Sequence, residues 1–266
     1  MTSIVDSVEI AGEKLPEVRK ISSADLDWAL AAGWDDFKSK RGDLLFAGLF
    51  YPIIGFTAAI FALNADLLVL LFPLLAGVSI LGPAVASGFY ELARRRESGL
   101  PTGWRWFFQP VKGRRRTPII VLTVCLAAVF VAWMFSAWLI YLFTLGGQTS
   151  PGSANIFQQI FTTDAGWTLI LIGNLVGFMF AVFTLVFSVV SFPMVVDRPV
   201  DAGTAIATSF KATRKNKRAI AGWGLRIAVL LFLGALPLFI GLAVVLPVLG
   251  YATWHLYTRL VVRETI

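Results

Sequence analysis

Long apolar stretches recur along this chain, and shorter polar stretches separate them. An α-helix needs about 17–25 apolar residues to cross roughly 30 Å of hydrocarbon. Six stretches meet that length, so the pattern predicts an all-α, polytopic membrane protein with six transmembrane helices in three hairpins. The predicted spans are residues 44–63, 67–90, 119–145, 167–192, 220–236 and 238–260.

Basic residues occupy only one set of connections between these spans. Arg94, Arg95 and Arg96 follow the second span, and further Lys and Arg residues precede the first, third and fifth spans. The alternate connections, which are residues 64–66, 146–166 and the break at Pro237, contain no Lys or Arg. This asymmetry is the positive-inside pattern, and it predicts that both termini lie in the cytoplasm.

Composition supports a membrane protein and argues against other classes. The 266 residues are 57% hydrophobic and carry a net charge of +7, with a mean hydropathy of +0.76. The basic residues flank apolar spans, where they meet anionic headgroups, so no nucleic-acid partner is expected. The first residues are acidic, unlike a secretory signal peptide. We therefore expect a flexible acidic tail over residues 1–22 and a six-helix membrane domain over residues 23–266.

Three short amphipathic segments, each ending in basic residues, precede the three hairpins. Ser22 and Asp25 in the first segment resemble a capping box. The segments predict short cytoplasmic helices that either lie in the headgroup layer or cap the helix ends, and they indicate a threefold repeat. The expected apolar faces are Leu26, Leu30, Trp34 and Phe37 in the first segment, Trp104, Trp106, Phe107 and Phe108 in the second, and Ala202, Ile206 and Phe210 in the third.

A second trace of repetition links the ends of the first and third hairpins at a constant offset. An even number of spans in each repeat would make the repeats parallel. The matching positions are Gly77, Pro83, Leu92 and Arg95 with Gly241, Pro247, Leu256 and Arg259.

Polar residues within or beside the spans are the candidate functional residues, because polar groups are costly in hydrocarbon. Arg226 either reaches the headgroups, pairs with a carboxylate or contacts a substrate, and Glu91 and His255 are candidate partners for it or for each other. Asn174 lies in a GxxxG spacing that favours close helix packing. The candidate functional residues are Arg226, Glu91, His255 and Asn174, and the candidate headgroup-binding residues are Arg114, Arg115, Arg116, Lys215, Lys217 and Arg218.

Sequence motifs for several chemistries are missing. The chain has no GxxxxGK[ST], GxSxG, HExxH or CxxC motif. Its single histidine cannot supply the ligands of a haem-copper centre, and Cys125 is expected to be a buried apolar residue. We therefore expect no enzyme activity, catalytic residue, cofactor or metal.

Four separated strings of this chain carry a resemblance to a known family. They are GPAVASGFYELARRRESG, FTTDAGWTLILIGNLVG, VVSFPMVVDRPVDAGTAIATSFKA and PVLGYATWHLY. In this order they resemble a bacterial integral membrane family called domain of unknown function 2189. The resemblance covers about residues 25–262, with one departure at Tyr251, where the family usually has a histidine. It implies a multi-pass protein of the bacterial inner membrane, and some members carry the label of cytochrome c oxidase subunit.

Two functions remain open from these residues. The first is a non-catalytic accessory, assembly or scaffold component of a membrane complex, such as a respiratory enzyme. The alternative is a small-solute transporter or channel built from parallel two-helix repeats, in which the candidate polar residues would line a cavity. The expected partners are a bilayer with anionic headgroups on the cytoplasmic side and either another membrane protein or further copies of this chain.

Overall fold

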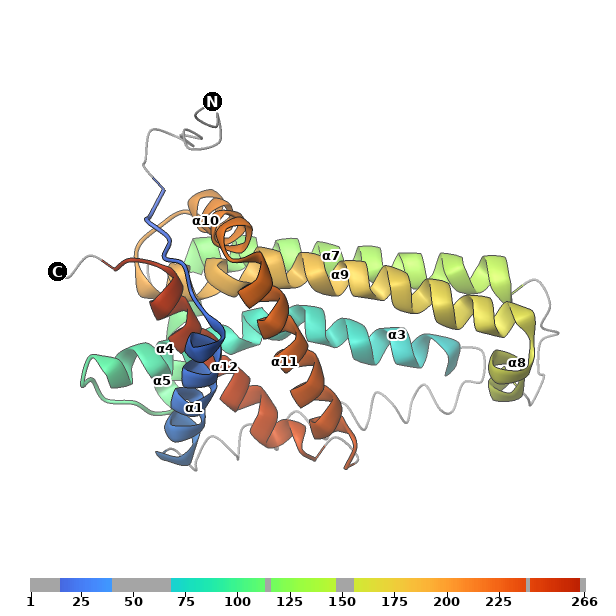
Figure 1. Ribbon diagram of the computed structural model, residues 1–266, viewed down its shortest axis with the longest axis horizontal. Coiled ribbons are helices and arrows are strands. Elements are labelled where there is room, and N and C mark those ends of the chain that lie inside the picture. Colours follow the sequence, from blue (N-terminus) through green and yellow to red (C-terminus); the bar gives the residue numbers. More distant parts are fainter. Residues whose placement is uncertain (1–14, 40–67, 113–115, 147–155, 238–239, 264–266) are drawn as a thin grey trace. The chain divides into compact units, whose positions relative to one another are not determined.

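A computed structural model describes residues 15–39, 68–112, 116–146, 156–237 and 240–263, and it contains helices but no strands in these ranges (Figure 1). The helices are α1 (Ser23–Ser39), α3 (Leu68–Val78), α4 (Gly82–Glu97), α5 (Trp104–Phe107), α6 (Gln109–Lys112), α7 (Arg116–Thr144), α8 (Ile156–Thr162), α9 (Asp164–Asp197), α10 (Ala202–Lys215), α11 (Lys217–Ala235) and α12 (Leu242–Leu260), with a 3-10 turn η2 (Ser79–Leu81) between α3 and α4. The predicted all-helical class is therefore confirmed for the described residues.

Four helical segments of the described chain are long and apolar enough to cross a membrane. They are Phe72–Glu97, Arg116–Thr144, Asp164–Asp197 and Lys217–Ala235. They correspond to the predicted second, third, fourth and fifth spans. The predicted first span, residues 44–63, lies outside the described residues.

The predicted sixth span is not among these four segments. The predicted span 238–260 includes α12, whose second half contains Thr253, His255 and Arg259 among aromatic residues. That half is too polar for a typical span, and most of it is buried inside the protein. The described part of the connection 146–166 contains the short helix α8.

The chain divides into two compact units. Unit 1 comprises residues 1–43, 83–122 and 186–266, and unit 2 comprises residues 44–82 and 123–185. The long helices α7 and α9 each contribute to both units. All three amphipathic segments belong to unit 1.

In unit 1, α1 packs closely on α12. A Cβ atom built on Gly33 of α1 would lie 2.6 Å from the backbone nitrogen of Ala252, so only glycine permits this approach. Leu26, Ala29 and Phe37 complete the buried face of α1, whereas Trp34 is exposed. The expected face of the first amphipathic segment is thus only partly right. Its predicted cap is confirmed, because the Ser22 backbone N–H donates to Asp25 over 2.9 Å.

The third segment, α10, packs through a different face from the predicted one. Its buried side consists of small and hydroxyl residues, and the Ser209 hydroxyl donates to the Val186 carbonyl of α9 over 2.6 Å. Phe210 lies on the exposed side. Small side chains form the contact between α10 and α9 because they allow the two helices to approach closely. The buried residues of α10 are Thr204, Ala205, Thr208, Ser209 and Ala212.

Matching contacts within unit 1 agree with the repeat hypothesis for α4 and α12. Arg95 of α4 stacks over Trp106 with 3.6 Å between the guanidinium carbon and the ring centre. Arg259 of α12 stacks over Trp28 of α1 at 4.0 Å. Both arginines end a repeat, and each tryptophan comes from an amphipathic segment. The first segment therefore has the same relation to α12 as the second has to α4.

In unit 2, α3, α7 and α9 pack around Trp133. The indole N–H of Trp133 on α7 donates to the Pro73 carbonyl of α3 over 2.7 Å. A Cβ atom on Gly177 of α9 would lie 3.0 Å from the Trp133 ring, whereas one on Gly173 would meet nothing within 4 Å. One glycine of the predicted GxxxG pair thus makes the close helix contact.

Candidate functional site

Polar side chains from α1, α4 and α12 meet in a cluster on unit 1, formed by Asp36, Arg96 and His255. One Asp36 oxygen lies 2.7 Å from an Arg96 guanidinium nitrogen. The other lies 2.9 Å from His255 Nε2. Asp36 is buried, and its position on the stripe of Leu26, Ala29 and Gly33 places a carboxylate among apolar contacts. The carboxylate therefore joins three helices that are distant in the sequence.

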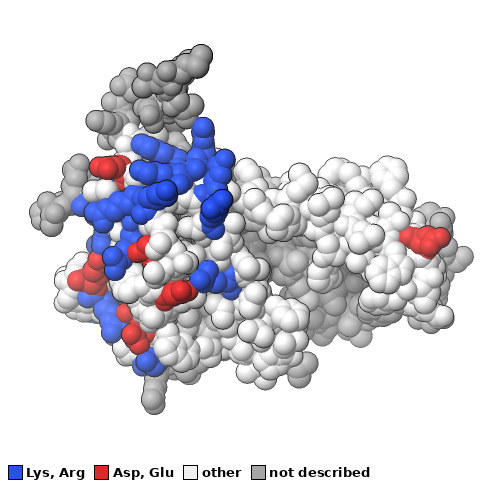
Figure 2. Space-filling model, viewed as in Figure 1, with Lys and Arg blue, Asp and Glu red and all other residues white. Residues whose placement is uncertain are grey.

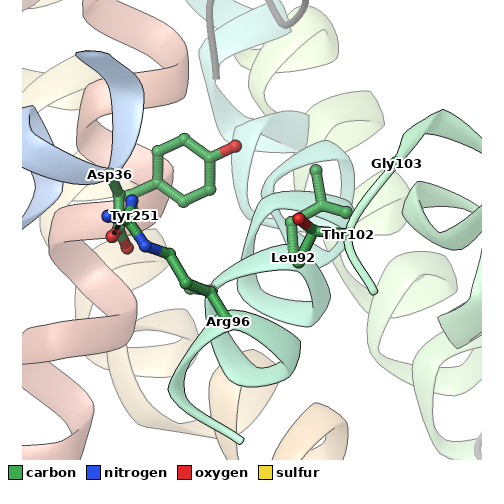
Figure 3. Close-up of a pocket in the computed structure, with 7 residues that line it drawn as sticks. Asp36, Leu92, Arg96, Thr102, Gly103 and Tyr251 are labelled. Atoms are coloured by element: carbon green, nitrogen blue, oxygen red, sulfur yellow. Dashed lines mark ion pairs between the residues drawn. The ribbon is translucent and has the colours of Figure 1, made fainter. Parts of the chain in front are cut away.

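A small pocket opens beside this cluster (Figure 3). Figure 3 shows Arg96 reaching toward Asp36 beside the ring of Tyr251. The loop that follows α4 forms the other wall. Gly99 ends the helix with φ of +66°, and Leu100 N–H donates to the Arg95 carbonyl over 2.8 Å. The lining residues are Asp36, Leu92, Ala93, Arg96, Thr102, Gly103 and Tyr251.

One aromatic ring and one hydroxyl group contact His255. The Trp28 ring stands edge-on to the imidazole with 5.6 Å between the ring centres. His255 is also hydrogen-bonded through its own backbone, since its carbonyl accepts from the Thr258 hydroxyl over 2.8 Å. The imidazole is thereby held against α1, and its Nε2 faces the Asp36 carboxylate.

Glu91 belongs to a second group of charges on α4. Its carboxylate forms two bonds of 2.8 Å with the Arg94 guanidinium, and Arg95 lies 3.5 Å away. The Glu91 side chain is only 2% exposed. Arg95 also donates to the Pro101 carbonyl over 2.8 Å. Two guanidinium groups of the same helix thus contact this buried carboxylate, and such a paired group suits a structural role.

A third group fastens the C-terminal segment. Arg263 binds Glu97 with one contact of 3.0 Å, and this hydrogen bond raises the pKa of the Arg263 guanidinium. The Tyr257 hydroxyl donates to Asp197 over 2.8 Å. Val18 forms a bridge with Val261, so residues 15–22 of the expected flexible tail are attached to the end of α12. Residues 1–14 of that tail lie outside the described residues.

Arg226 pairs with a carboxylate, but with neither Glu91 nor His255. Its guanidinium lies 2.6 Å from Asp27 of α1 and 3.3 Å from the Gly222 carbonyl of its own helix. Asn174 lies on the exposed side of α9 and donates to the Ile170 carbonyl over 2.7 Å. The structure thus gives Arg226, Glu91 and His255 three separate partners within unit 1.

The candidate headgroup-binding residues are mostly exposed where the structure describes them. Arg116, Lys217 and Arg218 are exposed at the starts of α7 and α11. Lys215 donates to the Val18 carbonyl over 2.6 Å and so also secures the N-terminal segment. Figure 2 shows Lys and Arg gathered over unit 1. Arg114 and Arg115 lie outside the described residues.

Sequence reasoning missed Asp36, Arg96, Trp28 and Arg259. A signal for Asp36 exists, because it lies on the same helical stripe as Leu26, Ala29 and Gly33. Cross-helix partners such as Asp36 and His255, 219 residues apart, leave no such signal in a single sequence.

No group of three or more His, Cys, Asp or Glu residues that could hold a metal occurs in the described ranges.

These helices and charge distributions define an integral membrane protein. Residues 71–197 match the family described as predicted integral membrane protein (DUF2189), which confirms the resemblance over that part of the chain. No curated protein matches the chain. No solved structure matches it either.

Proposed function

We propose that this protein is a non-catalytic accessory, assembly or scaffold component of a larger complex in the bacterial inner membrane, such as a respiratory enzyme. The observation that carries the proposal is the use of its charged groups. Asp36, Glu91 and Asp27 each pair with cations of the same chain, and these pairs join or cap helices. Such contacts stabilise a fixed shape for binding another protein.

Exposed apolar stripes on α7 and α9 provide the surface for such a partner. Leu171, Leu175 and Phe178 are spaced at three and four residues on α9, and each is more than 60% exposed. Val131 and Phe135 form a similar stripe on α7. Acyl chains or the helices of a partner membrane protein would cover these stripes.

A transporter gains no comparable support. That function needs polar side chains that converge on a cavity within the membrane. Arg226 and His255 bind Asp27 and Asp36, respectively. In the described part of unit 2, the hydroxyls of Ser136 and Thr168 bond to carbonyls one helical turn earlier.

The test is quantitative affinity purification of the tagged protein from native membranes in mild detergent, with a strain lacking the gene as control. We expect one membrane protein to be recovered in a fixed ratio. Phe178→Ala should lower that ratio, whereas Phe143→Ala, at the exposed end of α7, should leave it unchanged. A homogeneous protein that recovers no partner under several growth conditions would contradict the proposal.

A further inference from the structure

Arg226 of α11, in the third hairpin (α11 and α12), forms an ion pair with Asp27 of α1. Arg226 lies in the middle of α11, and its partner Asp27 has a side chain that is 66% exposed. An exposed carboxylate is costly within hydrocarbon, so this pair belongs at the headgroup or aqueous level. The turn of α11 that contains Arg226 is therefore the last one with a charge before the hairpin tip.

The helix beyond this pair is too short to cross a bilayer. Residues 227–235 of α11 extend about 14 Å at 1.5 Å per residue. Residues 242–250 of α12, which precede Tyr251 in the core of unit 1, also extend about 14 Å. The hydrocarbon is about 30 Å thick, so both legs reach only about its middle. By contrast, residues 123–144 of α7 and 164–185 of α9 each extend about 33 Å.

The hairpin tip has the composition of a segment that stays in hydrocarbon. Residues 227–250 contain no charged residue. Phe232, Leu236 and Ile240 are each more than 60% exposed in this structure, which contains no lipid. The outer connection of the second hairpin differs, because Gln158 and Thr162 are polar. An apolar turn in water would expose these side chains at a cost, whereas acyl chains would cover them.

The backbone of the turn also suits a medium without water. Ile240 N–H donates to the Pro237 carbonyl over 3.0 Å, and Val245 N–H donates to the Gly241 carbonyl over 3.0 Å. Pro237 has no N–H to satisfy. A Cβ atom on Gly241 would lie 2.8 Å from the Gly234 Cα atom, so the two glycines let the legs close tightly. Internal hydrogen bonds are required of backbone inside a membrane.

We propose that the third hairpin is re-entrant: it enters the leaflet on the side of unit 1, turns near the bilayer middle beyond the end of α11, and returns to the same side. Its partner is the acyl chains of that leaflet. The second half of α12 then packs in the core of unit 1, where Trp254, Leu256 and Tyr257 are fully buried. This topology keeps the C-terminus on the side expected from the charges. In this topology one re-entrant hairpin within a single leaflet takes the place of the fifth and sixth predicted spans.

Thiol labelling in sealed vesicles of both orientations tests this topology. Leu236→Cys is placed in a Cys125→Ser background and treated with a membrane-impermeant maleimide. Lys217→Cys at the start of α11 and Thr162→Cys in the outer connection serve as matched controls for the two sides. Ile240→Cys repeats the test at a second exposed position of the tip.

We expect Lys217→Cys to react in one vesicle orientation, Thr162→Cys to react in the other, and the two tip cysteines to react in neither. Detergent should make all four cysteines reactive. Reaction of the tip cysteines together with Thr162→Cys would show two full spans and overturn the proposal. Reaction together with Lys217→Cys would show a hairpin outside the membrane and would also overturn it.

Discussion

Unit 1 and unit 2 share the long helices α7 and α9, yet they differ sharply in charge. Asp164 is the one charged residue in the described part of unit 2. All described Lys and Arg residues belong to unit 1, where several pair across helices. Figure 2 shows the same contrast on the visible face. We therefore expect unit 2 to meet acyl chains and the charged part of unit 1 to meet water and headgroups.

Burial changes along α9 in the same way as charge. Leu171, Leu175 and Phe178 are more than 60% exposed in the part that belongs to unit 2. Phe192 and Met194, in the part that belongs to unit 1, are fully buried. One apolar helix therefore has two environments, and its hydropathy alone does not distinguish them. Its first part has an exposed apolar side, and its last three turns form protein core.

The largest loss of stability is expected from a substitution that forces α1 and α12 apart. Gly33→Val should lower the free energy of unfolding by about 3 kcal/mol, because the new side chain meets the Ala252 backbone. Gly173→Val in unit 2 is the matched control, since a Cβ atom there meets nothing within 4 Å. Thermal unfolding in detergent measures both. Equal losses of stability from the two substitutions would contradict the tighter packing expected at Gly33.

The charge cluster of unit 1 should contribute the next largest effect. Asp36→Ala leaves Arg96 and His255 without their shared carboxylate, and we expect a loss of about 2 kcal/mol in unfolding free energy. Asp35→Ala is the adjacent control. Its side chain is 67% exposed and pairs with exposed Lys38, so a change within about 0.5 kcal/mol is expected. Denaturant titration compares the two variants, and a larger loss for Asp35→Ala would argue against the cluster.

A smaller effect is expected at the centre of unit 2. Trp133→Phe removes the hydrogen bond to the Pro73 carbonyl while keeping most of the ring packing, and should cost about 1 kcal/mol. Trp138→Phe on the exposed side of the same helix should cost less. Unfolding in mixed detergent micelles measures the difference. No difference between them would show that α3 and α7 do not depend on this bond.

The smallest effect is expected at the start of α10, and it depends on pH. Asp201 caps this helix, and hydrogen bonds from Thr204 lower the pKa of the Asp201 carboxyl below its ordinary value of 3.8. A lowered pKa in the folded state stabilises the fold above the unfolded value, and that stability is lost as the pH falls through the folded value. Asp201→Ala should therefore cost about 1 kcal/mol at neutral pH and progressively less below about pH 4. A pH series of unfolding curves for both proteins checks this, and a pH-independent difference would contradict the cap.

Local features of the fold follow directly from the sequence. The predicted cap forms at Ser22 with Asp25, and a similar cap forms at Asp201 with Thr204, because each involves residues three positions apart. Hydropathy also predicts α7 and α9 to within a few residues, apart from the extension of α9 to Asp197. These features depend on neighbouring residues, which a single sequence contains.

Features that depend on distant partners were missed or misread. The apolar half of α12 predicts a span, whereas its second half packs closely on α1, where Ala252 meets Gly33. The buried face of α10 is determined by the close approach to α9 and not by side-chain hydropathy. Arg226 is a candidate inside a predicted span, and its partner Asp27 lies 199 residues earlier. Periodicity carries no information about such pairs.

The most direct test of the division into two environments compares spin labels at two exposed apolar positions. Leu175→Cys on α9 and Trp34→Cys on α1, each in a Cys125→Ser background, are labelled and reconstituted in bilayers. Collision rates with oxygen and with a polar nickel chelate then report the depth of each label. We expect Leu175 to be accessible to oxygen and protected from nickel, and Trp34, beside the exposed Asp35, to be accessible to nickel. Equal depths for the two labels, or a deeper label at Trp34, would contradict the account.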